Sequence, residues 1–333
     1  MYIIENDFLS PDEEISCETI NTPNQAYISC QHLDDLRTGM VMYNERRIRK
    51  SELLQLILLD NLYAQSGSER VIFQGGTALR WVYGGMRLSE DLDFVTNSPK
   101  KDIEKILDGT FQKAQIACVA QFGPGQWEVK ITGKRKEATK LFCIYRPETE
   151  RSRIAVKLEF EFLKADYQPQ FGRFILRDLP LVAALVTAGK LLMPYSSSII
   201  LVETPEEILS DKIRALYERT YIKGRDIYDI WWMKSQLKVS SDWVKVREKM
   251  DMYQTFFVPS READYFQEKE SASSIIEALK RDLPRFLPQN ILSVYEEEDF
   301  NRLITTLHEV TSDLLDQGMR KFLRDHEGRK RNY

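Results

Sequence analysis

The sequence predicts an α/β (α+β) fold in two parts, with a mixed-sheet domain over residues 1–203 and a helical bundle domain over residues 204–333. Before residue 204, apolar and polar residues alternate in several short runs, a period typical of half-buried strands. Beyond it, apolar residues recur every three or four positions, as in amphipathic helices. With 333 residues and 43% hydrophobic content, the chain is long enough for two cores.

Residues 1–44 mix proline, asparagine, threonine and aspartate with short apolar stretches, and we expect an irregular arm there. The clearest later strand covers 153–163, where Leu158 and Phe160 alternate with Glu159 and Glu161. The other elements expected before residue 204 are helices over 45–65, 77–83 and 101–115 and strands over 71–74, 92–96, 127–132 and 140–146.

Helix signals dominate the second part. Thr204-Pro205-Glu206-Glu207 is a capping box with proline at the first helical position, and helical spacing continues to residue 220. Gly224 interrupts this pattern, and a further helix is expected to begin near Ile227. Residues 275–283 and 302–323 are amphipathic.

Composition excludes several classes of site. The net charge of −4 gives no global attraction for nucleic acid, although residues 46–50 and 329–331 form local basic clusters that are also ordinary for a solvated surface. The four cysteines form no CxxC pair, which favours free thiols in a reducing cytosol. The three histidines lack ligand spacing, which argues against a histidine metal site or Ser-His-Asp chemistry.

The sequence also predicts a cytoplasmic protein. Its first residues are acidic and lack the cationic and apolar pattern of a signal peptide. No run of about 18 apolar residues is present, so no membrane span is expected.

Two aspartates form the most informative pattern in the chain. Asp91 and Asp93 alternate with Leu92 and Phe94, so in a strand both carboxylates lie on one face. Paired carboxylates are unfavourable unless a cation lies between them, and oxygen ligands favour hard ions such as Mg²⁺, or Mn²⁺. Two exposed acids on an edge strand would be the non-functional interpretation.

A small-residue turn precedes these acids. Gly75, Gly76 and Thr77 follow the apolar run at 71–73, and their backbone N–H groups and the threonine hydroxyl are suited to bind phosphate. A phosphate cradle followed by a two-carboxylate metal site indicates metal-assisted nucleotidyl transfer.

Further candidate site residues lie outside the glycine turn and the aspartate pair. A third acid could come from Glu159 or Glu161, with Glu159 preferred as a metal ligand, and Lys157 on the same face could touch phosphate. An ordinary amphipathic strand explains these residues equally well. Lys212, at the edge of an apolar helix face, could hold a triphosphate or simply extend its charged end to solvent.

Arg87 and Ser89 lie just before the aspartates, and the arginine could pair with one of them or contact phosphate. Asp226 and Asp229 lie in an early turn of a predicted helix, where the helix dipole alone favours acids.

With these residues assembled, the chain resembles the AbiEii/AbiGii toxin family of nucleotidyltransferases, a DNA polymerase beta-like group that includes MenT-type toxins. The resemblance covers residues 50–235, with Thr77 where many relatives have serine. The motifs that carry it are Gly75-Gly76-Thr77-Ala78-Leu79, Arg87-x-Ser89-x-Asp91-Leu92-Asp93-Phe94, Lys157-Leu158-Glu159, Asp211-Lys212-Ile213-Arg214-Ala215-Leu216 and Arg225-Asp226-Ile227-Tyr228-Asp229-Ile230.

The resemblance implies a polymerase beta-like nucleotidyltransferase domain and the toxin of a bacterial toxin–antitoxin or phage-defence (abortive infection) system, with a cognate antitoxin. Such an enzyme would transfer NMP from an NTP to an RNA 3′ end, with tRNA the favoured acceptor. The implied roles are phosphate contact by Gly76 and Thr77, magnesium binding by Asp91 and Asp93, a triphosphate contact from Lys212 and a catalytic role for Asp226.

Three other functions stay open from the sequence. Transfer to a protein hydroxyl uses the same chemistry. Asp-x-Asp also occurs in metal-dependent glycosyltransferases, which rarely place a Gly-Gly-Thr turn before the acids. A non-catalytic nucleotide-binding module is disfavoured by the intact acids and lysine.

Overall fold

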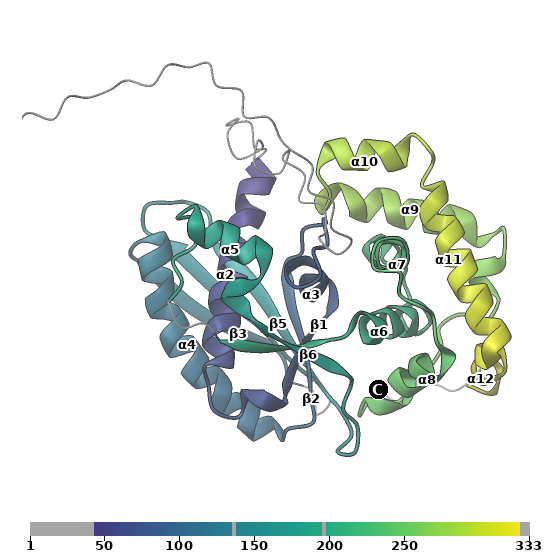
Figure 1. The fold of residues 1–333 in the computed structure, drawn as a ribbon, viewed down its shortest axis with the longest axis horizontal. Coiled ribbons are helices and arrows are strands. Elements are labelled where there is room, and N and C mark those ends of the chain that lie inside the picture. The colour runs from purple at the N-terminus through teal and green to yellow at the C-terminus, as the bar shows by residue number, and fades with distance from the viewer. Residues whose placement is uncertain (1–42, 135–137, 195–197, 327–333) are drawn as a thin grey trace, which may run out of the picture. The chain divides into compact units, whose positions relative to one another are not determined.

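The computed structural model describes residues 43–134, 138–194 and 198–326. Within these residues, a seven-stranded mixed sheet has the order β3-β4-β5-β2-β1-β7-β6. Figure 1 shows this sheet and the helices around it. Its strands are β1 (Val71–Gln74), β2 (Asp91–Thr96), β3 (Gly125–Lys134), β4 (Ala138–Pro147), β5 (Ile154–Phe162), β6 (Phe171–Ile175) and β7 (Ile199–Glu203).

The helices lie on both faces of this sheet. The helices before β7 are α2 (Tyr43–Tyr63), α3 (Gly75–Trp81), α4 (Lys100–Phe122) and α5 (Pro180–Thr187). Those after it are α6 (Pro205–Glu218), α7 (Gly224–Ser235), α8 (Trp243–Met252), α9 (Ser271–Asp282), α10 (Gln289–Glu296), α11 (Asn301–Leu314) and α12 (Arg320–His326). In the described part of the chain, 3-10 turns cover Ser68–Arg70, Leu176–Asp178, Tyr265–Gln267 and Leu283–Arg285, and a π-helical turn covers Leu315–Met319.

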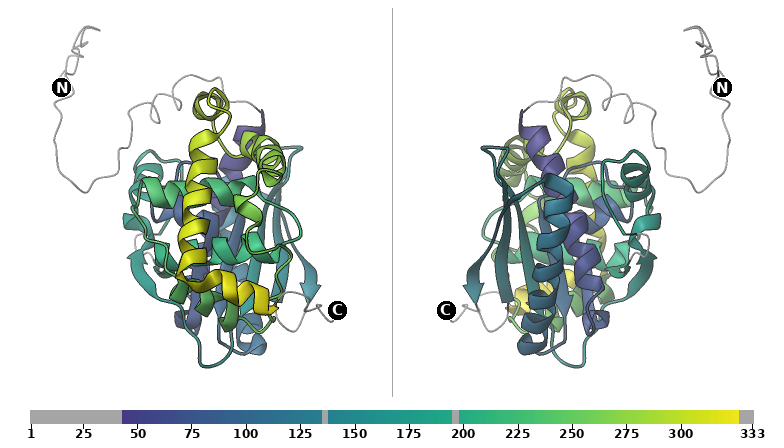
Figure 2. Two further views of the ribbon diagram at one scale, coloured as in Figure 1. Left: turned by 90° about the vertical axis from the view of Figure 1, so that its right-hand side faces the viewer. Right: turned by 90° about the vertical axis from the view of Figure 1, so that its left-hand side faces the viewer.

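Figures 1 and 2 show α2 and α4 side by side over one face of the sheet, whereas α6, α7, α8 and α11 lie on the other side. The central strands connect the two layers. β2 pairs antiparallel with β1 and parallel with β5, and β1 pairs parallel with β7. The sheet is therefore mixed, as predicted.

Alternation along β2 and β5 decides which side chains reach the core. Leu92, Phe94, Leu158 and Phe160 are fully buried, and the rings of Phe94 and Phe160 stack with centroids 4.8 Å apart. The intervening residues point to the opposite face, because neighbouring side chains in a strand alternate. The polar side chains of both strands consequently face α6 and α7 from a rigid support.

The predicted α/β class is confirmed, but several elements were missed. No element was expected for β6, β7, α5, α8 or α10. The amphipathic segment 302–323 was expected as one helix, whereas α11 and α12 are separated by a π-helical turn in which Gly318 has φ +127°. A glycine with positive φ interrupts regular helix geometry without changing the apolar spacing, so periodicity alone did not reveal the break.

Some expectations lie partly or wholly outside the described residues. The expected irregular arm, 1–44, lies outside them except for its last two residues, which begin α2, and the basic cluster 329–331 is also outside. Cys118 and Cys143 are buried free thiols, as expected, whereas Cys17 and Cys30 are not described. The domain boundary at residues 203/204 stays a prediction.

A buried lysine joins the sheet to the helices that follow it. Lys249 of α8 is completely buried, and its Nζ lies 2.6 Å from Glu203 Oε1 at the end of β7. The same ammonium lies 3.1 Å from Glu207 and 3.1 Å from Asp211, both on α6. Buried charges need partners, so this lysine holds three acids and thereby positions α6, which forms one wall of the site described below.

We expect Lys249→Met to lower the free energy of unfolding by about 3–5 kcal/mol, because it leaves buried carboxylates without a cation. Urea denaturation would measure the loss. Lys245→Met is the matched control, since Lys245 is on the same helix and its more exposed Nζ lies 3.4 Å from Glu207, a contact expected to contribute under about 1 kcal/mol. Equal stability of the two variants would contradict this account of the junction.

Candidate active site

A cavity of about 180 Å³ lies between the sheet and the first two helices of the second part of the chain. Gln74, Gly75 and Gly76 line it where β1 passes into α3. Most of the other lining residues are charged. The bases are Arg87, Lys157, Lys212, Arg214, Arg219, Lys223 and Arg225, and the acids are Asp91, Asp93, Glu159, Glu161, Asp211, Glu218 and Asp226. Both signs of charge are thus concentrated in a small volume.

The two aspartates of β2 meet the glycine turn in this cavity. Gly75 has φ +79°, and a Cβ placed on it would lie 2.9 Å from Asp93 Oδ2. Because any larger residue would press on this carboxylate, glycine is required for the close approach. In register, Asp93 lies between Gln74 of β1 and Glu159 of β5.

Asp93 has no ion-pair or hydrogen-bond partner in the described part of the chain, and its charge is poorly compensated. Burial raises its pKa to about 6, and the charges of Asp91 and Glu159 add to the effect. Asp91 has one weak cationic partner, since Arg225 Nη2 lies 3.8 Å from its Oδ2. A cation beside the two carboxylates would relieve this repulsion.

Asp91 and Asp93 suit a metal ion such as Mg²⁺ whose other ligands are water and phosphate, rather than a metal ion held only by protein side chains. Among the described residues, no group of three histidine, cysteine, aspartate or glutamate side chains is arranged to hold a metal ion. Magnesium is commonly bound by one or two carboxylates together with water and substrate phosphates. Asp91 and Asp93 fit that pattern.

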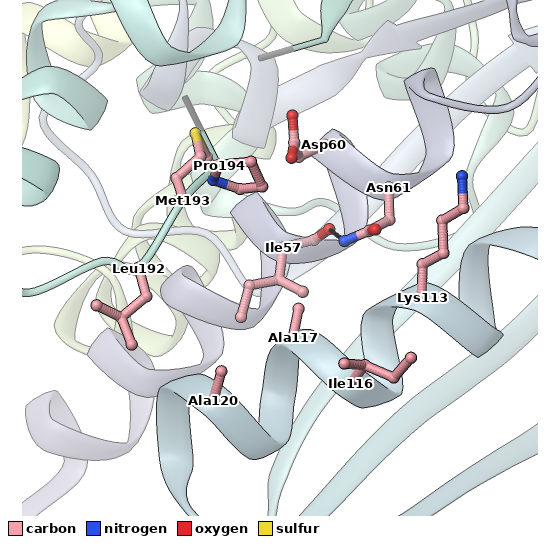
Figure 3. A pocket seen from close by; sticks show the side chains of 10 residues that line it. All are labelled: Ile57, Asp60, Asn61, Lys113, Ile116, Ala117, Ala120, Leu192, Met193 and Pro194. Carbon is pink, nitrogen blue, oxygen red and sulfur yellow. Dashed lines mark hydrogen bonds between the residues drawn. The ribbon is translucent and has the colours of Figure 1, made fainter. Parts of the chain in front are cut away.

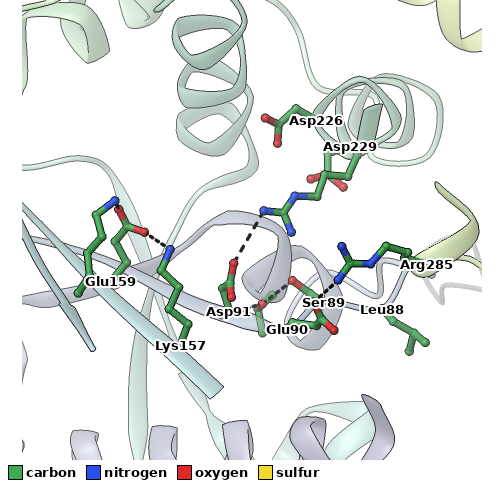
Figure 4. Close-up of polar contacts among 12 residues, drawn as sticks. Leu88, Ser89, Glu90, Asp91, Lys157, Glu159, Asp226, Asp229 and Arg285 are labelled. Carbon is green, nitrogen blue, oxygen red and sulfur yellow. Dashed lines mark hydrogen bonds and ion pairs between the residues drawn. The ribbon is translucent and has the colours of Figure 1, made fainter. Parts of the chain in front are cut away.

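Glu159, the preferred third acid, already has two cationic partners. Its carboxylate lies 2.6 Å from Lys157 Nζ and also pairs with Lys140. Although burial opposes ionisation, these two lysines lower the pKa of Glu159 below its ordinary value. Figure 4 shows Glu159 beside Lys157, and both residues line the cavity.

Glu161, the other possible third acid, has no ion pair with any described residue. Burial raises its pKa to about 7, even though Arg214 favours the charged form. The expectation that Glu159 completes the metal site stays a prediction. Of the two acids, Glu161 is the one whose carboxylate is not paired with a lysine among the described residues.

Thr77 does not line the cavity, which corrects the expectation that its hydroxyl is open to phosphate. Its side chain is fully buried, and its Oγ1 lies 2.7 Å from Ser89 Oγ. It also donates a hydrogen bond to the backbone carbonyl of Asp91. Thr77 therefore ties α3 to the start of β2, while Ser89 reaches the cavity.

Arg87 pairs with neither aspartate of β2, although this was one of the expected contacts. Its Nε and Nη2 donate to the two carboxylate oxygens of Asp229 at 2.6 Å each. A Cβ on Gly76 would lie 2.0 Å from Arg87 Nη2, so the second glycine makes room for this guanidinium. The bidentate geometry gives the pair a fixed orientation.

Lys212 connects α6 to α7. Its Nζ lies 2.6 Å from Asp226 Oδ1 and 2.9 Å from Asp229 Oδ2, and Asp226 also pairs with Arg219. Burial alone would raise the pKa of Asp226, but the nearby charges of Lys212, Arg219 and Lys223 lower it well below its ordinary value. Asp226 is thus a permanent anion inside the wall.

Sequence reasoning gave no role to Arg219, Lys223 or Arg225, which also line the cavity. Arg225 lies within a motif used for the resemblance, but its contact with Asp91 joins two segments far apart in the chain. Arg219 and Lys223 lie in the short connection between α6 and α7, where basic residues are ordinary. Nothing local in the sequence distinguishes them from surface residues.

A second, larger cavity of about 350 Å³ lies between α2, α4 and residues 192–194 (Figure 3). Its lining is mainly apolar and includes Ile57, Ala117 and Leu192, with Lys113 and Asp60 as charged members. It contains no pair of acids and no glycine turn, so we assign the chemistry to the smaller cavity.

Comparisons with known proteins identify a matching family. The family model described as "Nucleotidyl transferase AbiEii toxin, Type IV TA system" matches residues 57–325. No curated protein matches the chain. No helix in the described ranges 43–134, 138–194 and 198–326 is long and apolar enough to cross a membrane.

Two solved structures from Helicobacter pylori are similar to the chain. One is a candidate nucleotidyltransferase, with 16% identity and a TM-score of 0.47, and the match covers 86% of this chain and 99% of that one. The other is JHP933, with 16% identity and a TM-score of 0.47, covering 84% of this chain and 98% of that one.

We expect Asp93→Asn to raise the melting temperature of the metal-free protein above about pH 6, because it removes a poorly compensated buried charge. The pKa of Asp93 is raised from 3.8 to about 6 on folding, so this group stabilises the wild type less as pH rises across that interval. Thermal denaturation in EDTA would measure the effect of this charge, and thermal denaturation in Mg²⁺ would measure metal binding. Added Mg²⁺ should stabilise the wild type and the exposed control Asp108→Asn, but not Asp93→Asn.

Gly75→Ala should lower the free energy of unfolding by about 1–2 kcal/mol, because an L-residue is strained at this positive φ. It should also displace Asp93 and reduce the thermal shift caused by Mg²⁺. Gly133→Ala is the control, since the nearest atom to its added Cβ would be 3.9 Å away. A Gly75→Ala protein with wild-type stability and an unchanged Mg²⁺ shift would show that the close approach has no consequence.

Proposed function

The chain belongs to the AbiEii family of nucleotidyl transferase toxins of type IV toxin–antitoxin systems, and from this premise we propose that it transfers NMP from an NTP to the 3′ hydroxyl of an RNA, with tRNA as the favoured acceptor. The family implies an NTP substrate and a cognate antitoxin. Since NTP and tRNA are the proposed substrates, the cytoplasm is the proposed compartment.

The observation that carries the proposal is the pair of β2 carboxylates beside the glycine turn. Asp93 lies against Gly75 with no cation paired to it among the described residues, and Asp91 is on the same strand face. Mg²⁺ bound to both would neutralise charge on the triphosphate and favour its correct alignment. The basic side chains that line the same cavity are suited to an anionic substrate.

The protein's own residues would act mainly by positioning. Gly75 and Gly76 leave the backbone accessible at the cavity wall, and Ser89 lies beside the two aspartates in the sequence and lines the same space. Lys212, Arg87 and Asp226 would form the fixed wall against which the nucleotide is held. Orientation and charge compensation of this kind account for most catalysis of phosphoryl transfer.

In the proposed reaction, the RNA 3′ hydroxyl oxygen attacks the α-phosphorus in line with the leaving group. A phosphorus–oxygen bond forms to the RNA, the bond between the α-phosphorus and its bridging oxygen breaks, and pyrophosphate leaves with that oxygen. The hydroxyl proton is transferred to a base. Glu161, which lines the cavity and has a pKa raised to about 7 by burial, is a proposed acceptor for it.

We expect the wild type to label total tRNA when incubated with Mg²⁺ and one of the four α-labelled NTPs. Asp93→Asn should lower the labelling rate by at least about 100-fold, because a lost carboxylate ligand removes charge stabilisation of several kcal/mol. Asp108→Asn should label at the wild-type rate. Labelled RNA would be resolved on denaturing gels and sequenced at its 3′ end.

Equal labelling by Asp93→Asn and the wild type would remove the proposed role of the acid pair. A nucleotide mass adduct on protein, with none on RNA, would replace RNA by a protein hydroxyl as acceptor. Induction in cells provides a second measurement: growth should stop with the wild type and continue with Asp91→Ala at equal protein levels.

A further inference from the structure

Most basic side chains that line the active-site cavity already have an acidic partner. Arg87 is paired with Asp229, Lys157 with Glu159 and Arg214 with Glu218. The remaining pairs are Lys212 with Asp226 and Asp229, Arg219 with Asp226, and Arg225 with Asp91.

Lys223 differs from all of these. Within the part of the chain that the structure describes, its ammonium group has neither a hydrogen bond nor an ion pair, and its nearest aromatic contact is the ring of Tyr221 at 5.8 Å. It precedes the first residue of α7 and lines the same cavity as Asp91 and Asp93. It is therefore the one cavity cation in the described residues without an acidic partner.

The surroundings of Lys223 are electropositive. Burial lowers its pKa to about 8, and the charges of Arg219, Arg225 and Lys212 contribute to this shift, whereas Asp226 opposes it. The acid that could have compensated Lys223 is already paired with Lys212 and Arg219. An anion that entered the cavity would relieve this repulsion, as a cation would relieve the repulsion between the β2 carboxylates.

Lys212 is less available to a ligand than the sequence predicts. Its ammonium group is shared by two buried carboxylates at 2.6 and 2.9 Å. Moving it toward a phosphate would leave Asp226 and Asp229 with less compensation, and an uncompensated buried charge costs several kcal/mol. Lys223 has no such contact to lose.

We propose that Lys223 is the residue that binds the terminal phosphates of the NTP, and that Lys212 mainly holds the cavity wall together. This assignment rests on the proposed function, because the NTP is the substrate proposed for the cavity. A metal–triphosphate complex would then compensate the charges of both the β2 acids and Lys223. The β2 acids would face the metal ion, and Lys223 would face the terminal phosphates.

Binding of inorganic tripolyphosphate to the full chain tests this proposal without any choice of base and without catalysis. In EDTA, titration calorimetry should give an affinity that falls by about ten-fold or more in Lys223→Gln, the loss expected for a charge-assisted hydrogen bond. Lys223→Arg should bind within about three-fold of the wild type, since it retains the charge. Lys101→Gln, at an exposed position on α4, is the matched control and should bind as the wild type does.

A pH series separates a direct contact from a structural effect. From pH 7 to 9, the wild type should lose affinity relative to Lys223→Arg, because the lysine deprotonates near pH 8 while arginine stays charged. Thermal denaturation should show that Lys223→Gln is folded.

Unchanged tripolyphosphate affinity in Lys223→Gln, or no binding by the wild type, would overturn the assignment. The labelling assay with tRNA is independent of this result. The wild type could label no RNA but bind tripolyphosphate with an affinity that falls in Lys223→Gln. In that case RNA is not the acceptor, and the assignment of Lys223 is supported. If it labels RNA and Lys223→Gln binds normally, Lys223 is not the phosphate contact.

Discussion

A chain of ion pairs, buried except at the half-exposed Arg219, fixes one wall of the active site. It runs from Arg87 through Asp229, Lys212 and Asp226 to Arg219, and it joins the segment before β2 to both α6 and α7. Because removal of one partner leaves a buried charge uncompensated, each member holds its neighbours in place. The geometry of the cavity depends on this network. Lys249 stabilises the position of α6, because it pairs with Glu203 of β7 and with Asp211 of α6.

The opposite wall of the cavity, formed by β2 and β5, contains acids without an ion-pair partner in the described part of the chain. Asp93 and Glu161 face the cavity from adjacent strands, and neither has a cationic partner among the described residues, so burial raises the pKa of both. A folded protein retains unfavourable charge of this kind where a ligand compensates it, at some cost to the stability of the ligand-free state. The paired network and the unpaired acids are therefore complementary: the first fixes one wall of the cavity, and the second leaves negative charge on the other wall that a bound cation would compensate.

Glycine has two distinct roles where these walls meet. Gly75 allows the turn to lie against Asp93, whereas Gly76 makes room for the Arg87 guanidinium that binds Asp229. The sequence suggested phosphate binding for both glycines and for Thr77. The structure shows that part of this motif serves packing, because Thr77 is buried between Ser89 and the backbone of Asp91. Only contacts between distant segments reveal this division.

The sequence alone determined the α/β class, the central strands and the shared face of Asp91 and Asp93, because strand alternation is a local property that places every second side chain on one side. It left the third acid open and assigned no function to Lys223, since Glu159 and Glu161 share a strand face and a lysine in a loop resembles any surface lysine. Tertiary structure decided how these charges are paired: Lys140 and Lys157 engage Glu159, and Lys212 and Arg219 pair with Asp226, whereas Lys223 pairs with no acid among the described residues. Charge compensation depends on which distant groups come within a few ångströms of one another, and a local pattern does not contain that information.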